Sequence, residues 1–238
     1  MGGEHAEVVR LLWGPHPKPA RGPRPTLDLD RIARAGIEIA DSEGLADVSM
    51  QRVAAQLGVT KMALYRYVPG KAELVALMVD AAIGAYPAAK ARRGGWREEL
   101  EAWARQLLTV FRRHSWVLDA TVGPRITGPG ELSWLEHAVS ALDGTGLSGA
   151  ERMDAAVLLV GHVRGITQQA RAAGLAGNPE AQLGAILGDL MQAHGERFPA
   201  LTEALASAAQ SDGQDQAWDF GLQRILDGLA ALIDQRAR

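Results

Sequence analysis

Residues 61–71 combine cations and aromatic hydroxyls without a carboxylate. Lys61, Arg66 and Lys71 supply positive charge, and Tyr65 and Tyr67 supply hydroxyl groups. Cationic and hydroxyl side chains bind phosphate oxygens, and cationic side chains also read base edges in the major groove. This composition is typical of a surface that meets a nucleic acid.

The residues before this stretch predict a short helix that ends in a tight turn. Val53, Ala54 and Leu57 fall at helical spacing, and Ser49 stands where a helix cap is expected. Gly58 follows, and glycine readily adopts the left-handed conformation that stops a helix abruptly.

A second short helix follows the turn, with Thr60 as its expected cap and Leu64 and Val68 facing inward. The outward positions of this helix are Lys61, Met62, Ala63, Tyr65, Arg66 and Tyr67. The two helices together form the pattern of a helix-turn-helix.

Two longer helices are expected on either side of this motif. Asp28 is placed to cap a helix from Leu29 to about Glu43, and an apolar pattern predicts another from Lys71 to about Ala85. Three helices would then form a DNA-binding head over residues 27–72, and the fourth would lead out of it.

Residues 1–26 precede the head as a basic extension. Residues 1–13 can form a short helix, whereas residues 14–25 hold five of the eleven prolines and three cations. Such a segment is extended. It could lie along DNA with Arg21 or Arg24 in a minor groove, or it could be a solvated leader; the sequence leaves both open.

Composition places the chain among ordinary globular proteins. It has 238 residues, 47% of them hydrophobic and 22% charged, and no cysteine for a disulfide or a thiolate metal site. No apolar run reaches the roughly 20 residues of a membrane span, so we expect a cytoplasmic protein. The net charge is −3, but residues 1–71 hold ten Lys or Arg against eight Asp or Glu, and local charge governs phosphate contact.

Beyond residue 90 the patterns predict only helices, including Trp96–His114, one from Gly128–Pro129 to about Leu142, and one over 217–235. Ser148 and Glu151 form a capping box that opens a long helix to about residue 173, and Asn178-Pro179 opens the next. The predicted fold class is all-α, with a helix-turn-helix head and a larger ligand-binding and dimerisation bundle over residues 73–238.

Tryptophan and histidine side chains could shape a pocket in this bundle. Each indole is more readily explained as core, but several together can wall a cavity for a flat apolar ligand, with polar groups to orient it. His162 lies in an apolar helix and is expected to be a hydrogen-bonded core histidine rather than a metal ligand. The candidate ligand-binding residues are Trp103, Leu107, His114, Trp116, Trp134, His137, His162 and Gln168.

Two apolar helix faces could form a two-fold, four-helix dimer interface. Their residues are Val157, Gly161 and Arg164 in the long helix, and Leu222, Leu226, Leu229 and Ile233 in the last one. The spacing alone does not separate this interpretation from packing inside one subunit.

Other motifs predict no catalytic, cofactor or metal site. Residues 144–149 match G-x-G-x-x-G, but a helix precedes them, whereas a dinucleotide fingerprint follows a strand, so we interpret them as a connection between helices. The six histidines form no metal-binding pair, and no nucleophile elbow or phosphate loop is present.

Residues 27–77 resemble the tetracycline-repressor (TetR) family of bacterial transcriptional regulators. The resemblance is carried by Glu43-Gly44-Leu45, Val48-Ser49-Met50, Arg52-Val53-Ala54, Leu57-Gly58-Val59 and residues 64–71, LYRYVPGK. A weaker similarity covers the rest through residues 113–116, RHSW, and Gly146-Leu147-Ser148, and indicates the ligand-domain subtype of the tetracycline repressor.

The resemblance implies a homodimer that binds a palindromic operator in double-stranded DNA and releases it when a small-molecule inducer enters the C-terminal domain. It implies base contacts for Lys61, Met62, Ala63, Arg66 and Tyr67, and phosphate contacts for Ser49, Tyr65 and Lys71. The base-facing residues differ from those of the tetracycline repressor. Residues 121–125 also lack the histidine that helps to hold magnesium-chelated tetracycline, which argues against that ligand.

We therefore expect a repressor gated by a small apolar molecule. The alternative is a helical ligand-binding protein or enzyme whose head no longer binds DNA. Salt-dependent DNA binding separates the two hypotheses.

Overall fold

The computed structural model describes residues 3–14, 27–87, 94–172, 179–208 and 216–237. These residues form helices and no strand, as predicted. They divide into two compact units, Met1–Ala156 and Val157–Arg238. Because this division falls inside a helix, the boundary expected between residues 72 and 73 stays a prediction.

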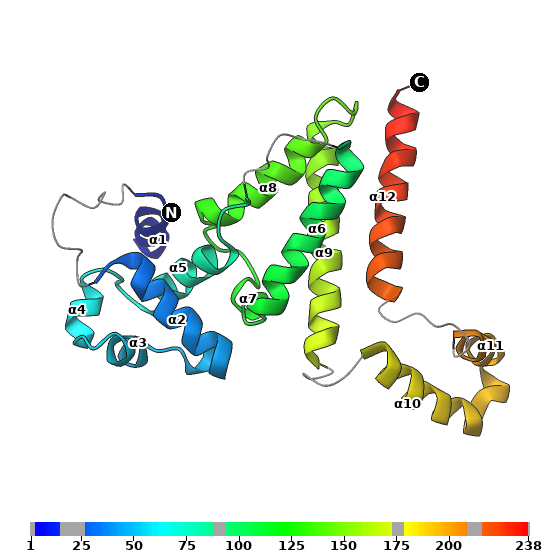
Figure 1. Cartoon of the computed structure of the whole chain (residues 1–238), viewed down its shortest axis with the longest axis horizontal. Coiled ribbons are helices and arrows are strands. Elements are labelled where there is room, and N and C mark those ends of the chain that lie inside the picture. Colours follow the sequence, from blue (N-terminus) through cyan, green and yellow to red (C-terminus); the bar gives the residue numbers. More distant parts are fainter. Residues whose placement is uncertain (1–2, 15–26, 88–93, 173–178, 209–215, 238) are drawn as a thin grey trace. The chain divides into compact units, whose positions relative to one another are not determined.

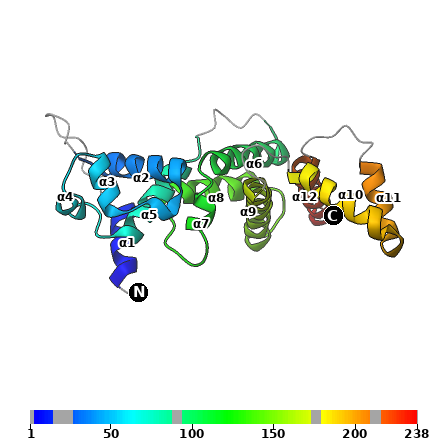
Figure 2. The ribbon, with the colours of Figure 1, turned by 90° about the horizontal axis from the view of Figure 1, so that it is seen from below.

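The first unit begins with α1 (Gly3–Trp13), followed by the head helices α2 (Leu29–Glu43), α3 (Met50–Gln56) and α4 (Lys61–Tyr65). A short 3-10 helix, η1 (Leu45–Asp47), joins α2 to α3, and α5 (Lys71–Ile83) follows α4. Figures 1 and 2 both place α4 at the outer edge of this unit, away from α6 and α8.

The remaining helices of the first unit are α6 (Trp96–Arg113), α7 (Val117–Ala120) and α8 (Pro129–Ala141), and α9 (Gly149–Ala172) starts in it. The predicted capping box opens α9, since Ser148 Oγ accepts from the backbone N–H of Glu151 and the Glu151 carboxylate accepts from that of Ser148. The G-x-G-x-x-G stretch lies between α8 and α9, as predicted.

The α2 and α5 helices pack closely because Gly36 has no side chain. A Cβ atom at Gly36 would lie 2.6 Å from the Sδ atom of the buried Met78. On its other side α5 contacts α1, whose Leu11 and Leu12 are buried. The predicted helix over residues 1–13 is therefore a packed element, whereas residues 15–26 lie outside the described residues.

Asp80 near the end of α5 caps the start of α8. Its Oδ1 atom accepts a hydrogen bond of 3.1 Å from the Glu131 backbone N–H, and the N–H of Gly130 also donates to this carboxylate. Positions 128 and 130 leave no room for a side chain, because a Cβ atom at Gly128 would lie 2.2 Å from Asp80 Oδ1. Burial raises the pKa of Asp80, although the two N–H groups act against that rise.

The second unit contains the rest of α9, then α10 (Pro179–His194), the 3-10 helix η2 (Gly195–Arg197), α11 (Pro199–Ala208) and α12 (Gln216–Arg236). The rings of His162 on α9 and Trp218 on α12 stack with centroids 5.2 Å apart, and His162 Nε2 lies 3.0 Å from the Trp218 carbonyl oxygen. The predicted hydrogen bond of His162 is thus present, but the residue is half-buried rather than part of the core. Within the described ranges, no helix is long and apolar enough to span a bilayer.

Candidate nucleic-acid interface

Side-chain caps fix the two helices of the helix-turn-helix. Ser49 Oγ accepts from the Arg52 backbone N–H at the start of α3, and Thr60 Oγ1 accepts from that of Ala63 at the start of α4, each at 3.2 Å. Gly58 lies between the two helices with a φ of 67°, a value that few residues with a side chain adopt. The predicted caps and the glycine turn are therefore confirmed.

The inner side of this motif is fully apolar. Val53, Leu64 and Val68 have no exposed surface, and Ala54 is also buried. Because α4 has only five residues, it is too short to be stable alone, and this packing holds it in place.

The outer side of α4 carries the residues that were predicted to contact DNA. Met62 is 74% exposed, and Tyr65 and Tyr67 are about half as exposed, at 37% and 40%. The Lys61 ammonium lies 5.5 Å from the Tyr65 ring centroid, within the range of a cation–π contact. The tyrosine ring can thereby orient this cation on the helix surface.

The predicted DNA-contact residues gather between the start of α3 and the start of α5. Arg66 follows α4, and Lys71 is the first residue of α5; both are exposed. Ala63 is half-buried, and Ser49 is half-buried with its hydroxyl engaged in the helix cap. Arg24 lies outside the described residues.

Arg52 was not predicted to have a role, and the structure assigns it one inside the head. Its guanidinium forms ion pairs with Glu43 at the end of α2 and with Asp47 in η1, the latter at 3.3 Å. The hydrogen bond that Arg52 donates to the Glu43 carboxylate raises the pKa of Arg52. This pairing ties α3 to the end of α2 and to η1. Asp47 and Glu43 gave only a weak signal of it in the sequence.

Some of the predicted ligand-binding residues meet in an aromatic cluster of the first unit. Trp103 and Trp134 are buried with ring centroids 6.2 Å apart, and Tyr86 lies edge-on to Trp134 and stacks on His137 at 4.0 Å. Leu107, one turn beyond Trp103 on α6, is buried. Tyr86, which lies just after α5, was missed because it is a single aromatic residue before a proline.

The buried indole N–H groups of this cluster already have acceptors. Trp103 Nε1 donates to the Trp134 carbonyl oxygen and Trp134 Nε1 to the Gly84 carbonyl oxygen, both at 2.9 Å. These bonds favour a core role for the two tryptophans. Tyr86 and His137 are half-buried and present the more accessible rings.

Of the other predicted ligand residues, two contact a different part of the first unit and two belong to the second unit. His114 and Trp116, at the end of α6 and the start of α7, contact Asp41 of α2. His162 and Gln168 belong to the second unit, where His162 is bonded to Trp218 and Gln168 is exposed. The structure therefore does not gather all eight residues into one site.

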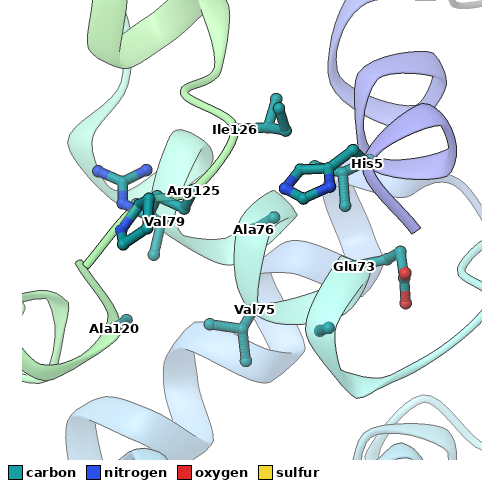
Figure 3. A pocket seen from close by; sticks show the side chains of 11 residues that line it. His5, Glu73, Val75, Ala76, Val79, Ala120, Arg125 and Ile126 are labelled. Atoms are coloured by element: carbon teal, nitrogen blue, oxygen red, sulfur yellow. The ribbon is translucent and has the colours of Figure 1, made fainter. Parts of the chain in front are cut away.

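A cavity of about 220 Å³ lies between α1, α5 and the segment after α7, and none of the predicted ligand residues lines it. Figure 3 shows the His5 ring and the Arg125 side chain on either side of Ala76 of α5. The remaining lining is largely apolar and includes Val8 and Ile126. The sequence signal was the apolar face of residues 1–13, which covers α5.

The residues predicted for a dimer interface fall into two groups. On α9, Val157 is 63% exposed, Gly161 is exposed and Arg164 is half-buried. On α12, Leu222, Leu226 and Leu229 are buried within the chain, which favours internal packing for them, and Ile233 is half-buried. Among the described residues no group of three or more His, Asp or Glu side chains could hold a metal ion.

Family models match most of the chain. Residues 32–78 match the model of bacterial regulatory proteins of the tetR family, and residues 87–233 match the tetracyclin repressor-like C-terminal domain. The chain is 40% identical to the HTH-type transcriptional repressor DrrR1 of Streptomyces coeruleorubidus, over 98% of this chain and 88% of the relative.

Solved structures give the same match. The apo form of ActR from Streptomyces coelicolor superposes with a TM-score of 0.74 at 25% identity, covering 90% of this chain and 99% of ActR. The complex of ActR with actinorhodin gives a TM-score of 0.71 at 28% identity, covering 87% of this chain and 98% of ActR.

Proposed function

The chain belongs to the TetR family of bacterial regulatory proteins, and on that premise we propose that it is a dimeric repressor released from a palindromic operator by a small molecule. The observation that carries the proposal is the exposed face of α4. That face presents Lys61, Met62 and Tyr65, with Arg66 and Tyr67 directly after it, and no carboxylate.

The proposed roles at this face follow from side-chain chemistry. Arg66 and Lys61 read base edges from the major groove, with the apolar Met62 and Ala63 against base methyl groups and Tyr67 beside them. Ser49, Tyr65 and Lys71 contact phosphates, because they stand at helix starts or at the border of the face. Arg24 adds a minor-groove contact from the N-terminal extension.

A second copy of the chain supplies the second head. Helix-turn-helix dimers bind half-sites about 34–36 Å apart, so both heads must hold the matching spacing. The exposed apolar surface of α9 at Val157, together with Gly161, supports its proposed place in the dimer interface. Arg164 and Ile233, both half-buried, are the further residues proposed for this interface.

The proposed inducer is a small apolar or amphipathic molecule. ActR holds actinorhodin in one solved structure and (S)-DNPA in another. Its similarity to the present chain supports a small-molecule ligand here as well. The rings of Tyr86 and His137, backed by Trp103 and Trp134, offer flat surfaces for such a molecule. Ligand binding would change head spacing through α5, which leaves the head and enters the core.

Footprinting of the purified protein on the DNA upstream of its own gene, at two salt concentrations, tests the DNA-binding part. We expect a protected palindrome of one to two helical turns whose affinity falls steeply with salt. Protection that does not change with salt would contradict the proposal, and so would the absence of binding to both upstream DNA and random DNA pools. Either result would favour a ligand-binding protein with an inactive head.

Fluorescence of the aromatic cluster tests the ligand part. Actinorhodin and (S)-DNPA are suitable first probes, followed by a library of small apolar molecules. A true inducer should both change tryptophan emission and lower operator affinity, with a coupling free energy of about 1–3 kcal/mol. A molecule that changes emission but leaves operator affinity unaltered would count against gating.

A further inference from the structure

The carboxylate of Asp41 in the head makes polar contacts to two residues of the bundle that follows the head, His114 and Trp116. Asp41 lies near the end of α2, and its Oδ1 and Oδ2 atoms are 2.8 and 3.0 Å from His114 Nδ1. Trp116 Nε1 donates to Asp41 Oδ1 at 2.7 Å. These contacts join positions 73 and 75 residues apart in the sequence.

Backbone hydrogen bonds fix the segment that carries His114 and Trp116. His114 ends α6 through a backbone bond to Val110, and its carbonyl oxygen accepts from the Val117 N–H at the start of α7. His114 and Trp116 are 8% and 3% exposed, whereas the Asp41 side chain is 32% exposed. The Asp41 carboxylate is thus partly exposed, whereas the two side chains that it contacts are buried.

The head side of the contact leads directly to the helix-turn-helix. The α2 helix packs on α3, and α3 packs on α4. Arg52 of α3 is also paired to Glu43, two residues after Asp41. A rotation of α2 about its packing on α5 would therefore carry α4 with it.

We propose that Asp41, His114 and Trp116 form a latch that holds the head in its operator-binding orientation. The inference rests on the proposed function, because it supposes that α4 reads an operator. Asp41 is a positioning residue, since it acts through α2 and α3 on a helix that it does not touch. The α2–α5 contact is apolar and therefore non-directional, whereas the bonds from Asp41 to His114 and Trp116 are directional and add a fixed attachment near the end of α2.

The decisive measurement is the ratio of operator affinity to random-DNA affinity for Asp41→Ala. Its matched control is Asp30→Ala, which removes an exposed carboxylate from the first turn of the same helix and makes the same change in net charge. We expect the ratio to fall about tenfold or more for Asp41→Ala only, because hydrogen bonds to a charged group are lost. Random-DNA affinity should change equally in both variants.

To separate an effect on stability from an effect on head orientation, both affinities are measured at a temperature well below the midpoint of thermal unfolding of each variant. Equal ratios for Asp41→Ala and Asp30→Ala would overturn the latch. Failure of the unaltered protein to prefer any sequence would instead overturn the proposed function, so the two outcomes are distinct.

Trp116→Phe provides a second test, because it removes the N–H donor together with the pyrrole part of the ring but keeps an aromatic side chain at this position. Trp13→Phe is the control, because Trp13 Nε1 likewise donates to a carbonyl oxygen, that of Thr127, at 3.1 Å. We expect a several-fold fall in the ratio for Trp116→Phe and none for Trp13→Phe. If Asp41→Ala does not fold, equal ratios for this pair overturn the latch.

Because the chain has no cysteine, head orientation can be followed with spin labels at Ala55→Cys on α3 and Thr109→Cys on α6. Dilution with unlabelled protein leaves label pairs within one chain. A narrow distance distribution should broaden or shift with Asp41→Ala and stay narrow with Asp30→Ala. An unchanged distribution would show that the latch does not orient the head.

Discussion

Two of the residues proposed to contact DNA, Arg66 and Lys71, should contribute to DNA affinity in different ways. Arg66 is exposed, carries a fork of donors and stands at the end of α4. Lys71 is also exposed but begins the next helix, and its proposed contact is with the DNA backbone alone. The two residues therefore predict different kinds of loss when each is removed.

Arg66→Ala should lower operator affinity by about 1–3 kcal/mol, because a base-edge contact is lost. Random-DNA affinity should fall much less, which a competition assay with both DNAs measures. Arg197→Ala, which removes an exposed cation from the second unit, is the control and should leave the operator affinity unaltered. Equal losses on operator and random DNA would show that Arg66 contacts phosphate instead.

Lys71→Ala should weaken binding to operator and random DNA alike, because a phosphate contact carries no sequence information. The slope of log affinity against log salt should decrease by about one. The measurement is a salt titration of each protein–DNA pair. A slope that matches the unaltered protein would remove Lys71 from the interface.

At the scale of helices, a glycine at a helix–helix contact determines how closely the two helices pack. Gly36→Ala should lower the free energy of unfolding by about 1–3 kcal/mol, because its new methyl group meets the buried Met78. Gly188→Ala in α10, where a Cβ atom meets nothing within 4 Å, should instead raise it by about 0.5–1 kcal/mol. Thermal unfolding of both variants checks the signs, and stabilisation by Gly36→Ala would contradict the tight α2–α5 contact.

The cap that α5 provides for α8 should give a pH dependence. Burial raises the pKa of Asp80 above its ordinary value of 3.8, so the folded chain holds this proton more tightly than the unfolded chain. The contribution of Asp80 to the free energy of unfolding is therefore largest at low pH, and it declines as the pH rises from 3.8 through the raised pKa.

Asp80→Asn isolates that contribution, because the amide keeps an acceptor oxygen but cannot ionise. Denaturant unfolding between about pH 3 and 7 measures it. The stability of the unaltered protein relative to the variant should decline across this interval and then level off. A relative stability that increases with pH would mean that the N–H groups of Gly130 and Glu131 outweigh burial.

The sequence predicted the helices and their caps better than the contacts between distant side chains. The boundary of α2 and the caps at Asp28, Ser49 and Thr60 were correct, because capping depends on neighbouring residues alone. Short α7 and α11 were missed, since neither has an apolar repeat of useful length. Asp41 reaches His114 only through the fold, so no local pattern could connect them.

At the scale of the whole molecule, assembly should depend on α9 more than on α12. Val157→Asp should favour the monomer at a protein concentration where the unaltered chain is dimeric, because a charge enters an exposed apolar face. Helical content should be unchanged. Light scattering and circular dichroism measure the two properties, and an unaffected dimer would exclude this face.

Leu222→Ala is the contrasting variant, because Leu222 has no exposed surface. It should cost about 2–5 kcal/mol of stability. At a temperature where it stays folded, the dimer should persist. Dissociation without loss of stability would return the α12 leucines to the interface.

The packing around Asp80 also constrains which substitutions this chain can accept during evolution. With an aspartate at position 80, any side chain at 128 or 130 collides with α5, so both glycines are fixed while that residue is kept. The clash at position 128 is with side-chain atoms of Asp80, whereas a Cβ atom at position 130 would also lie 2.9 Å from the backbone oxygen of residue 80, which every residue carries. Among relatives, position 130 should therefore stay glycine even where residue 80 differs, whereas a side chain at position 128 should occur only where residue 80 has changed.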